Sequence, residues 1–434
     1  NNQTYVARFC QRPGELIRKQ ELFDMILSGV SSVSSSIRLA LVTLASFVAF
    51  SLVCIFAVNV MPASAQISIN IDDDTRLSFR SGNFDVTRYS GRMFDVSLYE
   101  NDRLILTADE LVMESSGALN DQDFFIDNFY LRNGIIVGEQ LRFAEVTIEN
   151  VNIAEFIHAI EKREETGGPL LATGAGLSNE SRLQIKGIEI VADGILAKVK
   201  NVETLGLSFD QLPDGQRFFK DFGFVVDGFR MTPIKISSDT EELKRVLDAR
   251  GLDALTIDMA ISQAVTPIVD GLGVENMINL EMHDLASMQM LANVDLTFAA
   301  LATLNQIEHT DFSSLEQATP ILEGLRLRAF TGTYYDLGML DALVAVTAED
   351  EQMQSADVRT SMRLAISQGL QAFLPRNGMD LARPIETLIQ QGGGLELEVK
   401  PTQPVPLASF VGFMFMPDLA IDQLGVALTH LRSQ

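Results

Sequence analysis

The chain has 434 residues, of which 47% are hydrophobic, and it carries a formal net charge of −25 at pH 7. It is longer than the roughly 250–300 residues at which a single core stops growing, which predicts two domains or one elongated body. The excess of carboxylates repels nucleic-acid phosphates and anionic lipid headgroups. Nucleic-acid binding and electrostatic docking on a membrane are therefore excluded from the expected functions.

The N-terminal segment predicts the compartment. An apolar run at residues 39–61 is followed by Pro62-Ala63-Ser64-Ala65. Signal peptidase requires small residues at the −3 and −1 positions, here Ala63 and Ala65, so cleavage after Ala65 and export to the periplasm are expected. The same run is long enough to cross a bilayer, so an inner-membrane anchor at residues 39–61 is the alternative.

In both interpretations, residues 1–65 form a leader or an anchor outside the folded body. The two cysteines, Cys10 and Cys54, both fall in this segment. The rest of the chain is therefore expected to fold without disulfides or thiolate chemistry.

Residues 66–237 are predicted to form a β-rich meander domain. Apolar and polar residues alternate through residues 67–148, with turn residues between the alternating runs. That pattern is typical of antiparallel strands with one apolar and one polar face. Asn152 is expected to cap a short helix, and the Gly-rich stretch 166–178 to form a loop or linker, before strands resume.

Residues 238–434 are predicted to form a second, α+β domain with C-terminal helices. Its boundary is placed just before the capping box Ser238-Asp239-Thr240-Glu241, which opens a helix ending at Gly251. Three further helices are expected, each beginning near a residue able to cap it: Asp336, Ser355 and Asp380. The predicted fold is α+β, a predominantly antiparallel, elongated or curved β-sheet with a helix-rich C-terminal portion.

The segment 278–298 has the most regular pattern in the chain. Ten of its eleven even-numbered positions are apolar, and Asp284 is the exception. A single strand of this length would span about 70 Å, so a hairpin with its loop near residues 283–287 is expected. Because the even positions stay apolar on both arms, the loop must contain an odd number of residues.

The apolar face of this hairpin is the candidate ligand-binding surface. Its several methionines are adaptable side chains that suit a groove for an apolar ligand, and ordinary core packing is the alternative. The candidate residues are Ile278, Leu280, Met282, Met288, Met290, Val294, Leu296 and Phe298.

Motifs for metal, nucleotide or nucleophilic chemistry are not found in the sequence. His158, His283, His309 and His430 each lack a second His or Cys within five positions. No metal and no other cofactor is therefore expected, and the protein is predicted not to be an enzyme. Acidic residues are too numerous to identify a catalytic pair, and a buried pair of facing carboxylates would favour an enzyme instead.

Two resemblances accompany these patterns. Long alternating strands such as residues 141–151, preceded by a leader or anchor, resemble the AsmA-like group of bacterial envelope proteins. This resemblance covers about residues 66–300 and implies an elongated sheet with a hydrophobic groove and a role in lipid traffic and outer-membrane homeostasis. Residues from about 235 to 434, including 332–341 and 404–407, are similar to uncharacterised periplasmic proteins of alphaproteobacteria, a similarity that implies no activity.

The expected function is that of a non-enzymatic periplasmic protein of the cell envelope that binds or shields a lipid-like apolar ligand. The alternative is a structural or adaptor protein that docks a membrane-protein partner. Its contact would be an exposed apolar patch at residues 410–416.

Overall fold

The structure, a computed structural model, describes most of the chain after residue 66. The described residues are 67–70, 75–85, 90–116, 125–138, 141–152, 155, 176–192, 194–211, 217–235, 238–301, 315–413 and 415–433. The expected leader with Ala63 and Ala65, the expected helix after Asn152 apart from Glu155, and most of the stretch 166–178 lie outside the described residues. The N–H of Glu155 donates to Asn152 Oδ1 at 3.2 Å, the contact expected of a capping Asn.

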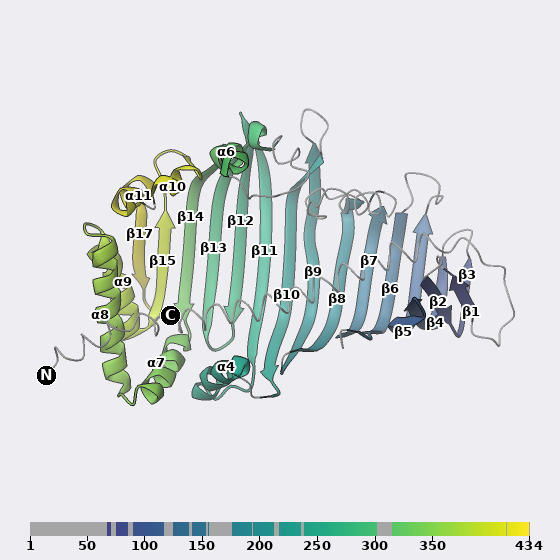
Figure 1. The fold of residues 1–434 in the computed structure, drawn as a ribbon. Helices are drawn as coiled ribbons and strands as arrows, with labels where there is room; N and C mark the ends of the chain where they lie inside the picture. Colours follow the sequence, from purple (N-terminus) through teal and green to yellow (C-terminus); the bar gives the residue numbers. More distant parts are fainter. Residues whose placement is uncertain are drawn as a thin grey trace.

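All strands of the described chain belong to one antiparallel sheet (Figure 1). From β4 to β15, each strand pairs with the next strand in the sequence. The strands are β1 (Ile67–Asn70), β2 (Thr75–Phe79), β3 (Ser81–Asp85), β4 (Ser90–Glu100), β5 (Arg103–Ser116), β6 (Phe125–Ile136), β7 (Leu141–Asn152), β8 (Leu177–Ala192), β9 (Ile195–Gln211), β10 (Arg217–Pro233), β11 (Leu255–Ile268), β12 (Gly271–Met282), β13 (Ala286–Thr297), β14 (Leu325–Asp336), β15 (Gly393–Val399), β16 (Val405–Pro406) and β17 (Val426–Leu431).

The two ends of the sheet are built from shorter strands. At the N-terminal end, β2 and β3 pair with different parts of β4, and β1 pairs with β2. At the C-terminal end, β17 pairs with β15, and the short β16 pairs with β14. The predicted predominance of antiparallel sheet is confirmed. The sheet is antiparallel because apolar and polar residues alternate along these segments and short turns join most neighbouring strands.

Most helices lie at the ends of the strands, whereas α8 and α9 lie beside β17 at the edge of the sheet (Figure 1). Figure 1 places α4 and α7 at one end of the strands, and α6, α10 and α11 at the other. They are α4 (Ser238–Ala249), α6 (Leu315–Gly324), α7 (Met339–Asp350), α8 (Ser355–Phe373), α9 (Gly378–Gln391), α10 (Ser409–Phe413) and α11 (Pro417–Leu424). Although α7, α8 and α9 separate β14 from β15 in the sequence, these two strands pair directly. The sheet therefore continues through the C-terminal portion.

The sheet also continues across the boundary expected before residue 238. Helix α4 connects β10 to β11, and these strands pair between residues 221–231 and 255–264. Strands from the two predicted domains thus share one hydrogen-bonded sheet. Separate folding units on either side of residue 238 stay a prediction.

One face of strands β2–β9 forms the buried core. Phe129 and Leu131 on β6 are 1% and 0% exposed. Inward-facing side chains of the neighbouring strands join the same cluster, and helix α4 adds Leu243 and Leu247. Each Å² of apolar surface removed from water stabilises the folded state by about 25 cal/mol. This cluster is therefore the main source of stability.

The inward–outward alternation of side chains reverses along one row that runs across strands β4–β10, which we call the phase-shift row. On β4, β6, β8 and β10 it is marked by residues with positive φ: Asp95 (52°), Asn133 (50°), Gly187 (64°) and Gly228 (61°). Side chains in a regular strand alternate between the two faces of the sheet. A residue with left-handed backbone angles reverses this alternation for the residues that follow it.

Inward-facing residues on the two sides of the phase-shift row are consequently three positions apart instead of two. On the strands with positive φ they are Met93 and Val96, Leu131 and Gly134, Ile185 and Ile188, and Val226 and Phe229. The intervening strands follow the same spacing at Ala108 and Leu111, Phe143 and Val146, and Val199 and Val202. Because each strand from β4 to β10 shifts at the same level, the core face stays apolar on both sides of the row.

Candidate functional site

The predicted hairpin is present as β12 and β13. Its loop consists of His283, Asp284 and Leu285, so the odd loop length expected from the sequence is confirmed. Asp284 has φ 61°, the left-handed conformation that closes three-residue hairpin loops. The even-numbered side chains of both arms therefore lie on the same face of the sheet.

Seven of the eight candidate ligand residues are brought together on this face. Leu280 pairs directly with Met288, and Ile278 pairs with Met290. Met282, Val294 and Leu296 occupy further positions on the same two strands. Phe298 lies beyond the end of β13 and is 37% exposed. Binding by these residues stays a prediction.

Neighbouring strands extend this surface, which we call the apolar face. On β11, Met259 pairs with Leu280 and Ile261 pairs with Ile278. On β14 and β15, Tyr334 pairs with Met288 and with Leu395. The apolar residues of the face are Ile257, Met259, Ile261, Val265, Val274, Ile278, Leu280, Met282, Met288, Met290, Val294, Leu296, Leu325, Leu327, Phe330, Leu395, Leu397 and Val399.

Burial changes along the apolar face. On β4–β9, the same side of the sheet is a closed core in which Leu111, Leu131 and Val146 are at most 2% exposed. On β12 and β13, by contrast, Ile278, Leu280, Met282, Met288, Met290, Val294 and Leu296 are all half-buried. The closed core on β4–β9 thus continues, on the same side of the sheet, into the partly accessible apolar face on β12 and β13.

Both ends of the apolar face are closed by buried contacts. At the hairpin loop, Leu285 is 1% exposed and belongs to the cluster that contains Leu247 of α4. At the opposite end, Val265 and Leu272 form a second buried cluster, against which Leu301 packs. The partly accessible region lies between these two ends.

Tyr334 is the one phenol on the apolar face. Its hydroxyl donates to Asp336 Oδ1 at 3.3 Å, and burial together with the Asp336 charge raises the pKa of Tyr334. The same carboxylate oxygen accepts the N–H of Leu340 at 2.9 Å, at the beginning of α7. Tyr334 therefore stays neutral, and its hydroxyl is already occupied.

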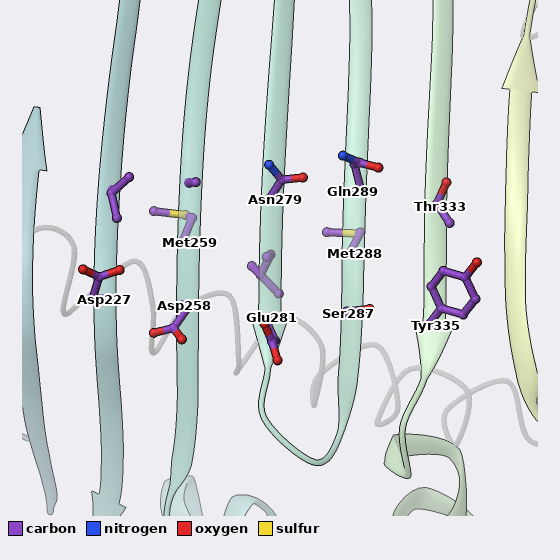
Figure 2. Close-up of a pocket in the computed structure, with 13 residues that line it drawn as sticks. Asp227, Asp258, Met259, Asn279, Glu281, Ser287, Met288, Gln289, Thr333 and Tyr335 are labelled. Carbon is purple, nitrogen blue, oxygen red and sulfur yellow. The ribbon is translucent and has the colours of Figure 1, made fainter. Parts of the chain in front are cut away.

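The opposite side of the same strands carries an acidic depression of about 380 Å³, which we call the polar-face hollow (Figure 2). Asp227, Asp258 and Glu281 come from β10, β11 and β12, and Thr333 and Tyr335 from β14. Most of its members alternate with the apolar-face residues along each strand, but Met259, Leu280 and Met288 of the apolar face also line it. Sequence reasoning missed it because its residues come from five strands whose register is not readable from the sequence.

Asp258, which lines the polar-face hollow, links two strands and a hairpin loop. Its Oδ1 accepts the N–H of Gly228 at 2.5 Å, and its Oδ2 lies 2.7 Å from His283 Nε2. Burial raises the pKa of Asp258, but the Gly228 N–H and the His283 ring outweigh it, so the pKa lies below its usual value. The hydrogen bond to Asp258 in turn raises the pKa of His283. This pair joins β10, β11 and the β12–β13 loop.

The expected patch at residues 410–416 is partly exposed. Phe415 is 81% exposed and Met416 is 54% exposed. Phe410 and Phe413 instead pack against each other, with ring centroids 5.5 Å apart. Met414 lies outside the described residues.

Across the described ranges, three or more His, Cys, Asp or Glu side chains are nowhere grouped so that they could hold a metal ion. Among the helices from α4 to α11, none combines the length and apolar character that a bilayer span requires.

One part of the chain is similar to a known family model. Residues 279–430, from β12 to β17, match the model of a family described as "Uncharacterized protein". No curated protein matches the chain. The matched residues include most of the apolar face on β12–β15.

Proposed function

We propose that this protein is a non-enzymatic protein of the bacterial periplasm that binds a lipid-like apolar ligand on the apolar face. The observation that supports this most directly is the half-buried state of Leu280, Met288 and their neighbours, on a face that is fully buried elsewhere in the same sheet. Each Å² of this surface that a ligand covers contributes about 25 cal/mol. A ligand laid along the two strands would therefore gain several kcal/mol before the cost of its immobilisation.

The chemistry of the face favours hydrocarbon over charged ligands. Asp336 and Leu325 lie at the two ends of β14. Between the cross-strand rows that contain them, the apolar-face residues on β11, β12 and β13 are uncharged. The chain as a whole carries a net charge of −25, which repels anionic headgroups. The ligand contact is therefore acyl chain on side chain.

The proposed compartment is the periplasm, and the proposed architecture is one elongated, curved sheet. Residues 1–65 act as the signal peptide, cleaved after Ala65, or residues 39–61 anchor the protein in the inner membrane. The body is an elongated, curved sheet with a helix-rich C-terminal portion, related to the AsmA-like envelope proteins. Cell fractionation and N-terminal sequencing of the purified protein test this, with Gln66 expected as the first residue.

Native mass spectrometry of the purified protein tests ligand binding. The expected result is a co-purifying lipid that is lost in Met288→Glu, because a carboxylate would have to be desolvated beneath the acyl chain. Gln289→Glu is the matched control, since it adds the same charge one residue later, on the opposite face. An empty wild-type protein would contradict the proposal.

Whether the Met288→Glu variant folds shows whether Met288 lines a ligand-binding groove or belongs to an ordinary core. If the variant unfolds, Met288 is part of an ordinary core, and the proposal loses its main support. Leu296→Glu, placed four rows along β13 from Met288, provides a second test of the same face.

A second candidate function is docking of a membrane-protein partner. Phe415 and Met416 favour it, because large apolar side chains with exposures of 81% and 54% are typical of interaction surfaces. Photo-cross-linking in intact cells from position 415 tests this function. A specific cross-linked membrane protein would support docking, and capture of lipid alone would not.

A further inference from the structure

Two amide side chains interrupt the apolar face. Gln263 of β11 and Asn276 of β12 are directly paired across the strands. Gln263 lies between Ile261 and Val265 in the alternation of β11, so its side chain shares their face. Both amides are half-buried.

The surroundings of this pair are apolar in every direction. The next residue in the same row is Ala292 on β13, followed by Phe330 on β14. The rows on either side are occupied by Ile278 with Met290, and by Val274 with Val294. Because an alanine side chain ends at Cβ, Ala292 does not reach over the Asn276 amide.

Neither amide has a hydrogen-bond partner among the side chains and backbone groups of the described residues. Several other polar side chains of the sheet are paired. Gln184 donates to Asn201 at 3.0 Å, and Tyr334 donates to Asp336 on the apolar face itself. Gln263 and Asn276 thus have free donors and acceptors on a surface where hydrocarbon is expected to bind.

This arrangement discriminates between ligands. A pure hydrocarbon that covers the row would remove water from both amides without replacing their hydrogen bonds, which is unfavourable by about 1–3 kcal/mol for each group. An ionic group at the same place would be buried without a counter-charge, because the neighbouring side chains on β11, β12 and β13 are uncharged. The ligand that fits carries a neutral group able to hydrogen-bond.

We propose that the ligand is a neutral acyl ester and that Gln263 and Asn276 hydrogen-bond its ester group while the acyl chain lies on the flanking rows. This inference rests on the function proposed above. The amide N–H groups donate to the ester carbonyl, which needs no charge on either partner. The apolar rows from Ile278 to Met282 extend about 20 Å beyond the amide pair and receive the chain.

A displacement assay with the full chain tests the inference. The probe N-phenyl-1-naphthylamine is bound to the apolar face first. It is then displaced either by monoolein, a neutral acyl ester, or by 1-octadecene, a hydrocarbon of the same chain length. In Q263L/N276L we expect monoolein to bind about tenfold more weakly, equivalent to about 1.4 kcal/mol, and octadecene to bind at least as well as before.

The opposite face offers a matched control. Asn279 of β12 and Gln289 of β13 form another directly paired amide couple, on the polar face. The variant N279L/Q289L makes the same kind of substitution, and we expect it to leave both affinities within twofold of the wild type. If this control weakens monoolein as much as Q263L/N276L does, the inference is wrong.

The outcomes separate the inference from the proposed function. Unchanged monoolein binding in Q263L/N276L overturns the ester contact but leaves ligand binding on the apolar face intact. A wild-type protein that binds neither the probe nor either lipid overturns both. If urea unfolding shows that the double variant is destabilised, Asn276→Val makes the comparison at one amide, with a residue that suits a strand.

Discussion

Glu110 of β5 and Arg132 of β6 are direct cross-strand partners whose Oε2 and Nη2 atoms lie 3.6 Å apart. The Glu110 side chain is 2% exposed, whereas Arg132 is 52% exposed. The Nε of Arg92 contacts the other carboxylate oxygen. A buried carboxylate is therefore compensated by two arginines whose outer parts remain in water.

Removal of both arginines is expected to destabilise the sheet strongly. The double variant Arg92→Met/Arg132→Met leaves the buried charge of Glu110 unpaired, which we expect to lower the free energy of unfolding by about 3 kcal/mol, measured by urea denaturation. Arg230→Met is the control. Its partner Asp253 is 86% exposed, so a loss below about 0.5 kcal/mol is expected. Equal losses in the two experiments would contradict this interpretation of Glu110.

Gly187 is expected to be more sensitive to alanine than Gly206. Both have positive φ, at 64° and 58°. A Cβ at Gly187 would lie 2.7 Å from the Cβ of Ala144, whereas nothing lies within 4 Å of a Cβ at Gly206. We expect Gly206→Ala to lose about 1 kcal/mol from backbone strain, and Gly187→Ala about 1–2 kcal/mol more from the contact, by thermal denaturation.

The His283–Asp258 pair predicts a modest dependence of stability on pH. The pKa of His283 is raised in the folded protein. Its contribution is therefore complete below the unfolded value of about 6.5 and disappears as the pH rises through the folded pKa. The lowered pKa of Asp258 gives the opposite sign, a contribution present above about 3.8 and lost on further acidification.

The size of the His283 effect is limited by solvent. The two side chains are 44% and 39% exposed, so about 0.5 kcal/mol is expected. Urea midpoints at pH 5.5 and pH 8.5 measure it, with His283→Gln as the variant in which this difference disappears. A wild-type protein whose excess stability over His283→Gln increases from pH 5.5 to pH 8.5 would contradict the assignment.

Asp336 is expected to stabilise the beginning of α7. Its Oδ1 accepts both the Leu340 N–H and the Tyr334 hydroxyl. We expect Asp336→Ala to lower the free energy of unfolding by about 1–2 kcal/mol, because a helix N–H and a buried phenol lose their acceptor. Tyr334→Phe removes only the phenol bond and should lose about half as much. Asp336→Asn, which keeps the acceptor, should recover most of the stability in the same denaturation experiment.

The sequence predicted those features that depend on local alternation. The even positions between Ile278 and Leu296, together with the odd loop length, were sufficient to place Leu280 and Met288 on one face, whereas their direct pairing required the structure. Helix α8 was also predicted, but its expected cap, Ser355, was wrong by one residue. Gln354 occupies the N-cap and Ser355 is the first helical residue, because capping depends on backbone angles rather than residue type alone.

Features that depend on the pairing of distant strands could not be predicted. The phase-shift row contains Asp95 and Asn133, which read in sequence as ordinary polar strand or turn residues. Its coherence appears only when the strands are in register. The Gln263–Asn276 pair was missed for the same reason, since the two amides that the sheet makes adjacent are separated by twelve residues in the sequence.

The order of strands has a consequence for how the polypeptide acquires its shape. From β4 onward to β14, each strand finds its partner in the segment that follows it directly. A chain that emerges N-terminus first, from a ribosome or a translocation pore, can therefore add one hairpin arm at a time to an existing template. Such vectorial growth keeps loop-closure entropy small at every step and leaves a single growing edge at risk of aggregation.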